Sequence, residues 1–137
     1  MRQARQLRLF AGKRQRGVLP PPPKEENLHF QIADILRLWI IPPFRYTYMP
    51  MGEYRPKATA ALLKRKGMTP SWPDFLIIGP QRCIWIECKR KGEKPTPEQI
   101  DMGSFLMAVG CTYILDHDLK SIITQLRDLG VVRARVT

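Results

Sequence analysis

The chain has 137 residues, with 23 Lys and Arg against 12 Asp and Glu, and a formal net charge of +11 at pH 7. This length allows one hydrophobic core and excludes two. A charge this positive indicates a polyanionic partner, and nucleic acid is the commonest, although a ribosomal or membrane-surface protein is equally basic.

The three cysteines, Cys83, Cys88 and Cys111, have irregular spacing and match neither a zinc knuckle nor a disulfide framework. We expect them to be small buried residues in a reducing compartment. No apolar run reaches the roughly 18 residues of a membrane span, and the basic N-terminus lacks the apolar segment of a secretory signal. We therefore expect a cytoplasmic protein, bacterial or phage-encoded, with no membrane partner and no small-molecule cofactor.

Residues 1–23 contain no acid and end in four consecutive prolines, Pro20–Pro23. A proline run cannot be helical and favours an extended polyproline conformation. We predict a basic, flexible arm over 1–23 and one folded domain over 24–137. The arm is open to two overlapping interpretations, a phosphate-contacting segment and a solvated tail.

The first helix is expected from about residue 24 to 41. Apolar residues at helical spacing mark its buried face: Leu28, Ile32, Ile35, Leu36 and Trp39. Glu25 and Glu26 stand in its first turn, where the helix dipole favours anions, so their position has a sufficient structural explanation.

The remaining elements follow from alternation, turn residues and caps. We expect strands over 44–48, 75–78, 83–88 and 112–115, and helices over 59–66, 97–109 and 119–129. The short connection between 78 and 83 predicts a hairpin. The resulting order predicts an α/β fold, with a central mixed β-sheet flanked by helices.

Charged residues interrupt the two apolar hairpin strands. Asp74 begins the first strand, while Glu87 and Lys89 lie two apart on the second and so face the same side. Such residues are rarely buried without a partner. Each is ordinary alone, since Asp after Pro forms turns and Glu87 with Lys89 could be a surface salt bridge. Together, in strands otherwise apolar, they predict a catalytic site.

Phosphodiester hydrolysis requires charge neutralisation and an activated water, and Mg²⁺ held by carboxylates supplies both. Asp74 and Glu87 can be ligands, together with the backbone carbonyl of Cys88. Lys89 can orient the attacking water or stabilise the developing charge. Glu25 is the best candidate for a third acid, because it precedes core residue Leu28 by three positions.

The pattern Pro73-Asp74 followed by Glu87-Cys88-Lys89 resembles the PD-(D/E)XK nuclease signature. The flanking residues are similar to the stand-alone VRR-NUC domain over about residues 24 to 130, and they are Arg55, Leu62-Leu63-Lys64, Gly67, Trp72, Arg90, Gly92 and Thr96-Pro97-Glu98-Gln99. Two positions depart from that pattern, Ser71 where the family usually has Gly and Cys88 where valine is commoner.

This resemblance implies a restriction-endonuclease-like fold, dependence on Mg²⁺ or Mn²⁺, and structure-selective cleavage of branched or junction DNA by a homodimer. It implies Asp74 and Glu87 as metal ligands, with Glu25 binding directly or through water and Glu26 as the alternative. Glu25, Asp74, Glu87, Lys89 and Gln99 would then be the catalytic set.

Six cations flank the predicted site and are expected to contact DNA phosphates, the ordinary alternative being a solvated surface: Arg55, Lys64, Arg65, Lys66, Arg90 and Lys91. The two histidines, His29 and His117, are expected to be structural or exposed. Two other classes remain open. One is a catalytically inactive nucleic-acid-binding module on the same fold. The other is a structural basic protein, which explains the charge but not the acids in strands.

Overall fold

The structure is a computed structural model that describes residues 24–133, with side chains from Asn27 onwards. The predicted arm, residues 1–23, lies outside this range, as do residues 134–137. Eight elements follow one another: α2 (Lys24–Trp39), β1 (Arg45–Tyr48), α3 (Lys57–Arg65), β2 (Phe75–Gly79), β3 (Arg82–Cys88), α4 (Pro97–Ala108), β4 (Thr112–Asp116) and α5 (Leu119–Asp128). Their order is the predicted one.

The four strands form one mixed sheet in the order β1-β2-β3-β4. The first two pairings are antiparallel and the β3–β4 pairing is parallel. The β2–β3 hairpin turns through Pro80 and Gln81, and Gln81 has a positive φ of 55°. A parallel neighbour requires a crossover connection, which here contains α4. The α/β class and the mixed sheet are thus confirmed.

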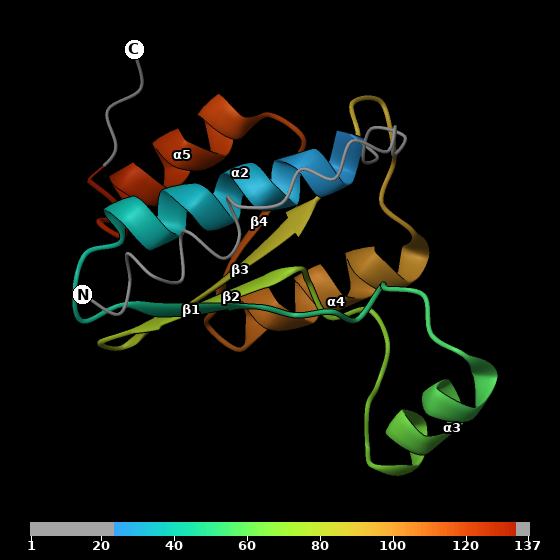
Figure 1. The fold of residues 1–137 in the computed structure, drawn as a ribbon. Coiled ribbons are helices and arrows are strands. Elements are labelled where there is room, and N and C mark those ends of the chain that lie inside the picture. The colour runs from blue at the N-terminus through green and yellow to red at the C-terminus, as the bar shows by residue number, and fades with distance from the viewer. Residues whose placement is uncertain (1–23, 134–137) are drawn as a thin grey trace, which may run out of the picture.

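Helices cover both faces of the sheet, with α2 and α5 on one side and α4 on the other (Figure 1). Alternation along β3 matches these layers. Ile84, Ile86 and Cys88 are buried in the core with residues of α2 and α5, whereas Trp85 and Glu87 point to the α4 side, where Trp85 packs against Trp72. Every residue from Ile84 to Lys89 is buried, so β3 is the centre of the fold.

The predicted end of the first helix is wrong by two residues, and its last core residue is wrong as well. The helix ends at Trp39, whose side chain is 43% exposed. Beyond it, Ile40 bridges Val132 and the Ile41 amide bonds to the Val131 carbonyl. Both valines are buried. The C-terminal segment therefore fills the end of the core that helical spacing assigned to Trp39.

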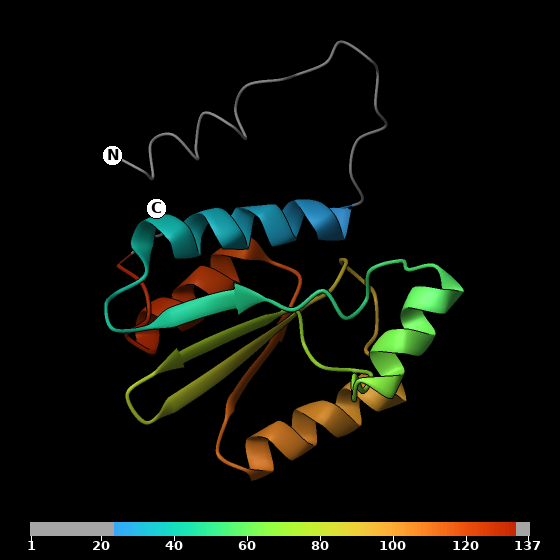
Figure 2. The same cartoon turned by 60° about the horizontal axis from the view of Figure 1, so that its bottom comes forward.

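Helix α3 projects from the body of the molecule (Figures 1 and 2). It begins at Lys57, two residues earlier than predicted, because Pro56 occupies the N-cap position. None of its residues is buried, and its last turn carries Lys64 and Arg65. The core of the domain therefore does not depend on this helix. Within residues 24–133, no helix has the length and apolarity needed to cross a lipid bilayer.

Helix α4 lies close against β4 because Gly103 has no side chain. A Cβ atom at Gly103 would come within 2.5 Å of the Tyr113 ring, nearer than any van der Waals contact allows. Gly costs about 1 kcal/mol relative to Ala inside a helix, so its presence here reflects packing. This close approach holds α4 against β4.

We expect Gly103→Ala to lower the free energy of unfolding by about 1–2 kcal/mol, because the overpacking cost exceeds the gain in helix propensity. Chemical denaturation followed by circular dichroism measures it. Gly52→Ala is the matched control, since nothing lies within 4 Å of a Cβ there. In the double variant Gly103→Ala/Tyr113→Leu the clash is removed, so the loss of stability should be smaller than the sum of the two single losses. Purely additive losses would contradict this account.

Candidate active site

Asp74 lies directly beside the Glu-Cys-Lys segment. Phe75 pairs with Ile86 in the antiparallel register, so Asp74 stands opposite Glu87. The Cys88 amide donates a 2.7 Å hydrogen bond to Asp74 Oδ2, and the Met49 amide donates one of 2.7 Å to the Asp74 carbonyl. Hydrogen bonds to a carboxylate are about twice as strong as neutral ones. The Asp74 carboxylate is therefore fixed at the end of β3.

Glu87 is only 5% exposed, and the side chain of Gln99 on α4 holds it. Gln99 Nε2 donates a 2.9 Å hydrogen bond to Glu87 Oε1. The other end of this amide belongs to a capping box, because Gln99 Oε1 accepts from the Thr96 amide at 3.0 Å. The helix start thereby directs the NH₂ group at Glu87. Glu would also complete a capping box, but it would present a carboxylate to Glu87.

Lys89 is 6% exposed and extends the parallel pairing one residue beyond β3. Its amide donates to the Asp116 carbonyl at 2.9 Å, at the end of β4. Its Nζ lies 3.7 Å from Glu93 Oε1, too far for a strong hydrogen bond. The ammonium is thus held on the same side of the strand as Glu87, by backbone pairing with β4.

Asp116 is a site-building residue that the sequence analysis missed. Its carboxylate accepts bonds from the amides of His117 (2.7 Å) and Asp118 (3.1 Å) and from the Ser121 hydroxyl. Burial raises its pKa, but these bonds outweigh burial and lower the pKa below its ordinary value. The carboxylate organises the turn into α5, and the carbonyl of the same residue holds Lys89. The sequence did contain a signal for such a turn, because two acids, Asp116 and Asp118, flank His117 directly before a helix.

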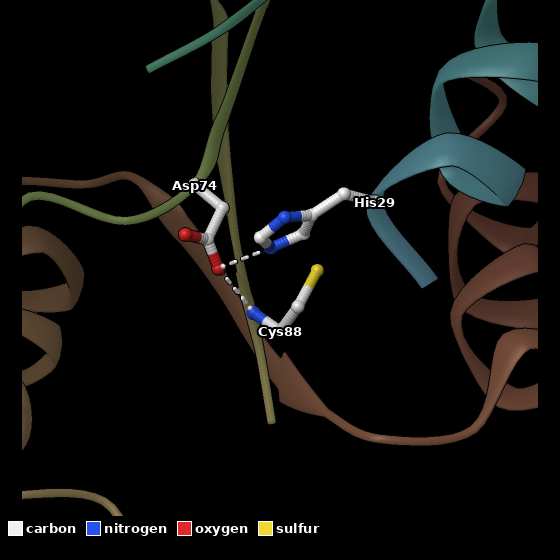
Figure 3. Close-up of side chains that lie close together, drawn as sticks. All are labelled: His29, Asp74 and Cys88. Carbon is white, nitrogen blue, oxygen red and sulfur yellow. Dashed lines mark hydrogen bonds and ion pairs between the residues drawn. The ribbon is translucent and has the colours of Figure 1, made fainter. Parts of the chain in front are cut away.

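His29 was expected to be structural or exposed, yet it lies against Asp74. Its Nε2 is 3.4 Å from Asp74 Oδ2, and both side chains are 17% exposed (Figure 3). The ring packs against Tyr48 and Phe75, with centroid distances of 5.4 and 6.0 Å. His29 lies four residues after Glu25, so both residues lie on one helix face. This spacing in the sequence could have indicated that His29 lies near the site.

Two tyrosines report the electrostatics of the site. Burial, followed by the negative charges of Glu87 and Asp74, raises the pKa of Tyr113 to about 12. Burial raises the pKa of Tyr48 to about 12 as well, with further contributions from Glu53 and Asp74. Both phenols therefore remain neutral hydroxyl groups at physiological pH, close to concentrated negative charge.

The other predicted site residues differ in where the structure places them. Glu25 and Glu26 belong to the first turn of α2, but their side chains lie outside the part that the structure describes. The Arg55 guanidinium donates to the carbonyls of Pro50 and Met51, so it braces its own loop. The remaining cations are exposed, at the C-terminal end of α3 and in the segment after β3: Lys64, Arg65, Lys66, Arg90 and Lys91.

Ser71 stands where the family pattern has glycine, and it keeps the backbone conformation that glycine favours. Its φ of 73° lies in the left-handed region, which costs a serine about 1 kcal/mol or more. The turn that leads into Pro73 and Asp74 is therefore retained despite the substitution, and Asp74 still reaches the Cys88 amide.

Comparisons with known proteins agree with this fold. Two solved structures described as "VRR_NUC domain" and "VRR_NUC domain protein" are similar. The first has a TM-score of 0.53 and 17% identity, covering 77% of this chain and 95% of its own. The second has a TM-score of 0.62 and 18% identity, covering 80% and 89%. The chain therefore has the restriction-endonuclease-like fold of VRR-NUC domains, as its sequence resemblance implied.

Among curated proteins, the chain is 43% identical over 54 residues to "Putative nuclease p44" of Acyrthosiphon pisum secondary endosymbiont phage 1. The match covers 37% of this chain and 58% of that relative, so it spans little more than half of the relative's length. No protein-family model matches the chain.

We expect Asp116→Asn to lower the free energy of unfolding at pH 7 by about 1–2 kcal/mol, through loss of charge-assisted bonds. A depressed pKa stabilises the fold above the ordinary pKa of about 4, and this contribution disappears as pH falls through the folded-state value. The difference from wild type should therefore shrink on acidification. Denaturant titrations between pH 7 and 2.5 measure it.

Asp128→Asn is the control for this prediction, since it removes the same charge from an exposed residue next to Arg127. It should change stability by less than about 0.5 kcal/mol. A pH-independent difference for Asp116→Asn would show that the carboxylate charge is not what stabilises the turn.

Proposed function

We propose that this protein is a metal-dependent DNA endonuclease that hydrolyses phosphodiester bonds, with selectivity for branched or junction DNA. The observation that carries the proposal is the meeting of Asp74 with Glu87 and Lys89 at the end of two paired strands. Two of these three charges are almost completely buried. Burying charge is costly, so a cluster of two carboxylates and an ammonium calls for a functional reason.

The comparisons support a nuclease. The similar phage protein carries that description, and the similar structures are VRR-NUC domains. The formal charge of +11 suits a DNA substrate. The phage relative also fits the expected cytoplasmic location in a bacterium, either host- or phage-encoded.

The donor set fits Mg²⁺ or Mn²⁺, because carboxylates and a backbone carbonyl are the hard oxygen ligands that these ions prefer. Asp74, Glu87 and the Cys88 carbonyl would hold the ion. One oxygen of each carboxylate accepts a protein hydrogen bond that sets the orientation of the group. We propose Glu25 as the third acid, directly or through water, with Glu26 as the alternative. A bound divalent ion would supply charge neutralisation and a more acidic water.

The chain's own groups would divide the remaining work. The Lys89 ammonium orients the attacking water or stabilises the charge that develops on the phosphate. Gln99 holds Glu87 in its binding orientation. The exposed cations of α3 and the segment after β3 hold the DNA backbone on either side of the scissile bond.

The proposal also covers the oligomeric state and the extent of the folded domain. One domain offers one site, so cleavage of both strands of a junction favours a homodimer. We also propose that the folded domain extends over 24–137 and that the basic arm over 1–23 adds phosphate contacts. A catalytically inactive DNA-binding module on the same fold is the alternative, and product formation separates the two.

The first prediction of this proposal concerns cleavage. Labelled single-stranded, duplex, flap, splayed and four-way-junction DNA are incubated with protein and Mg²⁺, Mn²⁺ or EDTA. We expect metal-dependent products, most abundant on a branched substrate. Asp74→Asn and Lys89→Ala should reduce the rate by at least about 100-fold, the scale on which removal of one electrostatic group acts.

Gln99→Glu is the sharpest variant for this assay, because it preserves the capping box while opposing Glu87 with a second carboxylate. We expect a loss of activity with the overall helix signal retained in circular dichroism. Glu98→Gln, an exposed neighbour on the same helix turn, is its control. Binding of every substrate without cleavage under all metal conditions would reject the endonuclease and support the inactive module.

A second prediction concerns the cations of α3. The triple variant Lys64→Ala/Arg65→Ala/Lys66→Ala should bind all DNA shapes more weakly and show a shallower salt dependence. Each lost phosphate contact reduces the slope of log K against log salt by about 0.9 on duplex DNA. Fluorescence anisotropy across a salt series measures it, with Lys120→Ala/Arg127→Ala on α5 as control. An unchanged slope in the triple variant would exclude α3 from the DNA interface.

A further inference from the structure

A second set of metal-binding atoms gathers on the α2 side of Asp74. His29 Nε2, an Asp74 carboxylate oxygen and Cys88 Sγ lie within 4.8 Å of one another. Figure 3 shows the His29 ring reaching from its helix toward Asp74, with the Cys88 side chain beside both. Within residues 27–133, this is the single group of three such residues close enough to share an ion. The hard-ion site proposed above does not use the imidazole or the thiol.

The distances suit a four-coordinate ion after a small adjustment. Bond lengths of about 2.0–2.3 Å to N, O and S place tetrahedral ligands about 3.3–3.7 Å apart. His29 Nε2 and Asp74 Oδ2 are already 3.4 Å apart. Small rotations about the χ angles of Cys88 and His29, moving each ligand atom by about 1 Å, would bring the remaining ligand–ligand distances into this range.

Packing and hydrogen bonding already orient the His29 ring and the Asp74 carboxylate before any ion arrives. The His29 ring packs against Tyr48 and Phe75, and the Cys88 amide fixes Asp74. Cys88 is fully buried, while His29 and Asp74 keep 17% of their side-chain surface exposed. The Nε2 atom of His29 is itself buried, so an ion reaches the group through movement of the His29 side chain, and the thiol is protected from other chemistry.

We propose that His29, Asp74 and Cys88 form a site for a thiophilic divalent cation of the Zn²⁺ type. Cys88 binds as the thiolate and releases its proton to solvent, and one water completes the coordination. Mg²⁺ prefers oxygen ligands, whereas imidazole and thiolate select later transition metals. The two ions would thus share the Asp74 carboxylate and use different atoms of Cys88, its carbonyl for the hard ion and its thiolate for the other. Because both ions need the Asp74 carboxylate, the Zn²⁺-type ion would inhibit the nuclease; this consequence rests on the proposed function.

Cobalt absorption spectroscopy tests the site without any DNA. Purified protein is titrated with Co²⁺, a spectroscopic substitute for Zn²⁺. We expect one Co²⁺ per chain, tetrahedral d–d bands and a thiolate-to-cobalt charge-transfer band, all removed by stoichiometric Zn²⁺. Cys88→Ser should abolish the charge-transfer band. His29→Gln should weaken binding by at least the roughly 10–100-fold that loss of an outer-shell partner causes.

The chain contains its own controls. Cys83→Ser and Cys111→Ser should keep the band, because neither residue belongs to the group. Glu87→Gln should also keep it, since Glu87 belongs to the hard-ion set alone. In wild type, excess Mg²⁺ should weaken Co²⁺ binding through Asp74, and Glu87→Gln should reduce this competition. Thermal melts confirm that each variant is folded.

Three results would overturn the site: no charge-transfer band in wild type, a band that survives Cys88→Ser, or a band lost in folded Glu87→Gln. The last would place the ion with the hard-ion ligands. Absence of nuclease activity leaves the test intact, because the spectra require neither substrate nor turnover.

Discussion

The hydrogen bond from the Cys88 amide to the Asp74 carboxylate is the contact on which the site depends. It joins the residue before β2 to the last residue of β3, at the end of the hairpin pairing. The antiparallel register sets Asp74 opposite Glu87, and this bond fixes the Asp74 carboxylate at the Glu-Cys-Lys segment. The left-handed conformation of Ser71 and the rigid Pro73 aim the chain into this bond, so local backbone cost supports a functional contact.

The two faces of strand β3 have different roles, because successive side chains point to opposite sides of the sheet. Its Ile84, Ile86 and Cys88 side chains build the core against α2 and α5, while Glu87 and Lys89 take the other side of the sheet. The two buried side chains are positioned from separate elements, Glu87 by the Gln99 amide of α4 and Lys89 by backbone pairing with Asp116 of β4. The crossover that makes β3 and β4 parallel is therefore also what assembles the site.

Helix capping and the proposed site meet at Gln99. The same amide completes the helix cap with its oxygen and holds Glu87 with its nitrogen. The absence of a side chain at Gly103 lets α4 lie close enough to the sheet for this contact. On the opposite face, His29 reaches Asp74 from α2. The α4 layer thus contacts the Glu87 carboxylate, and the α2 layer contacts the Asp74 carboxylate on the neighbouring strand.

The sequence by itself determined the order of elements and the α/β class with a mixed sheet, because periodicity, caps and strand alternation are local signals. It also singled out Asp74, Glu87 and Lys89 as candidates, as charges in apolar strands, and Gln99 through the family resemblance. Only the tertiary structure decided that His29 lies against Asp74, that Asp116 supports Lys89, and that Trp39 is exposed. These outcomes depend on how α2 crosses the sheet and on where Val131 and Val132 return to the core. Contacts between segments distant in sequence leave no periodic trace in either segment, so packing alone reveals them.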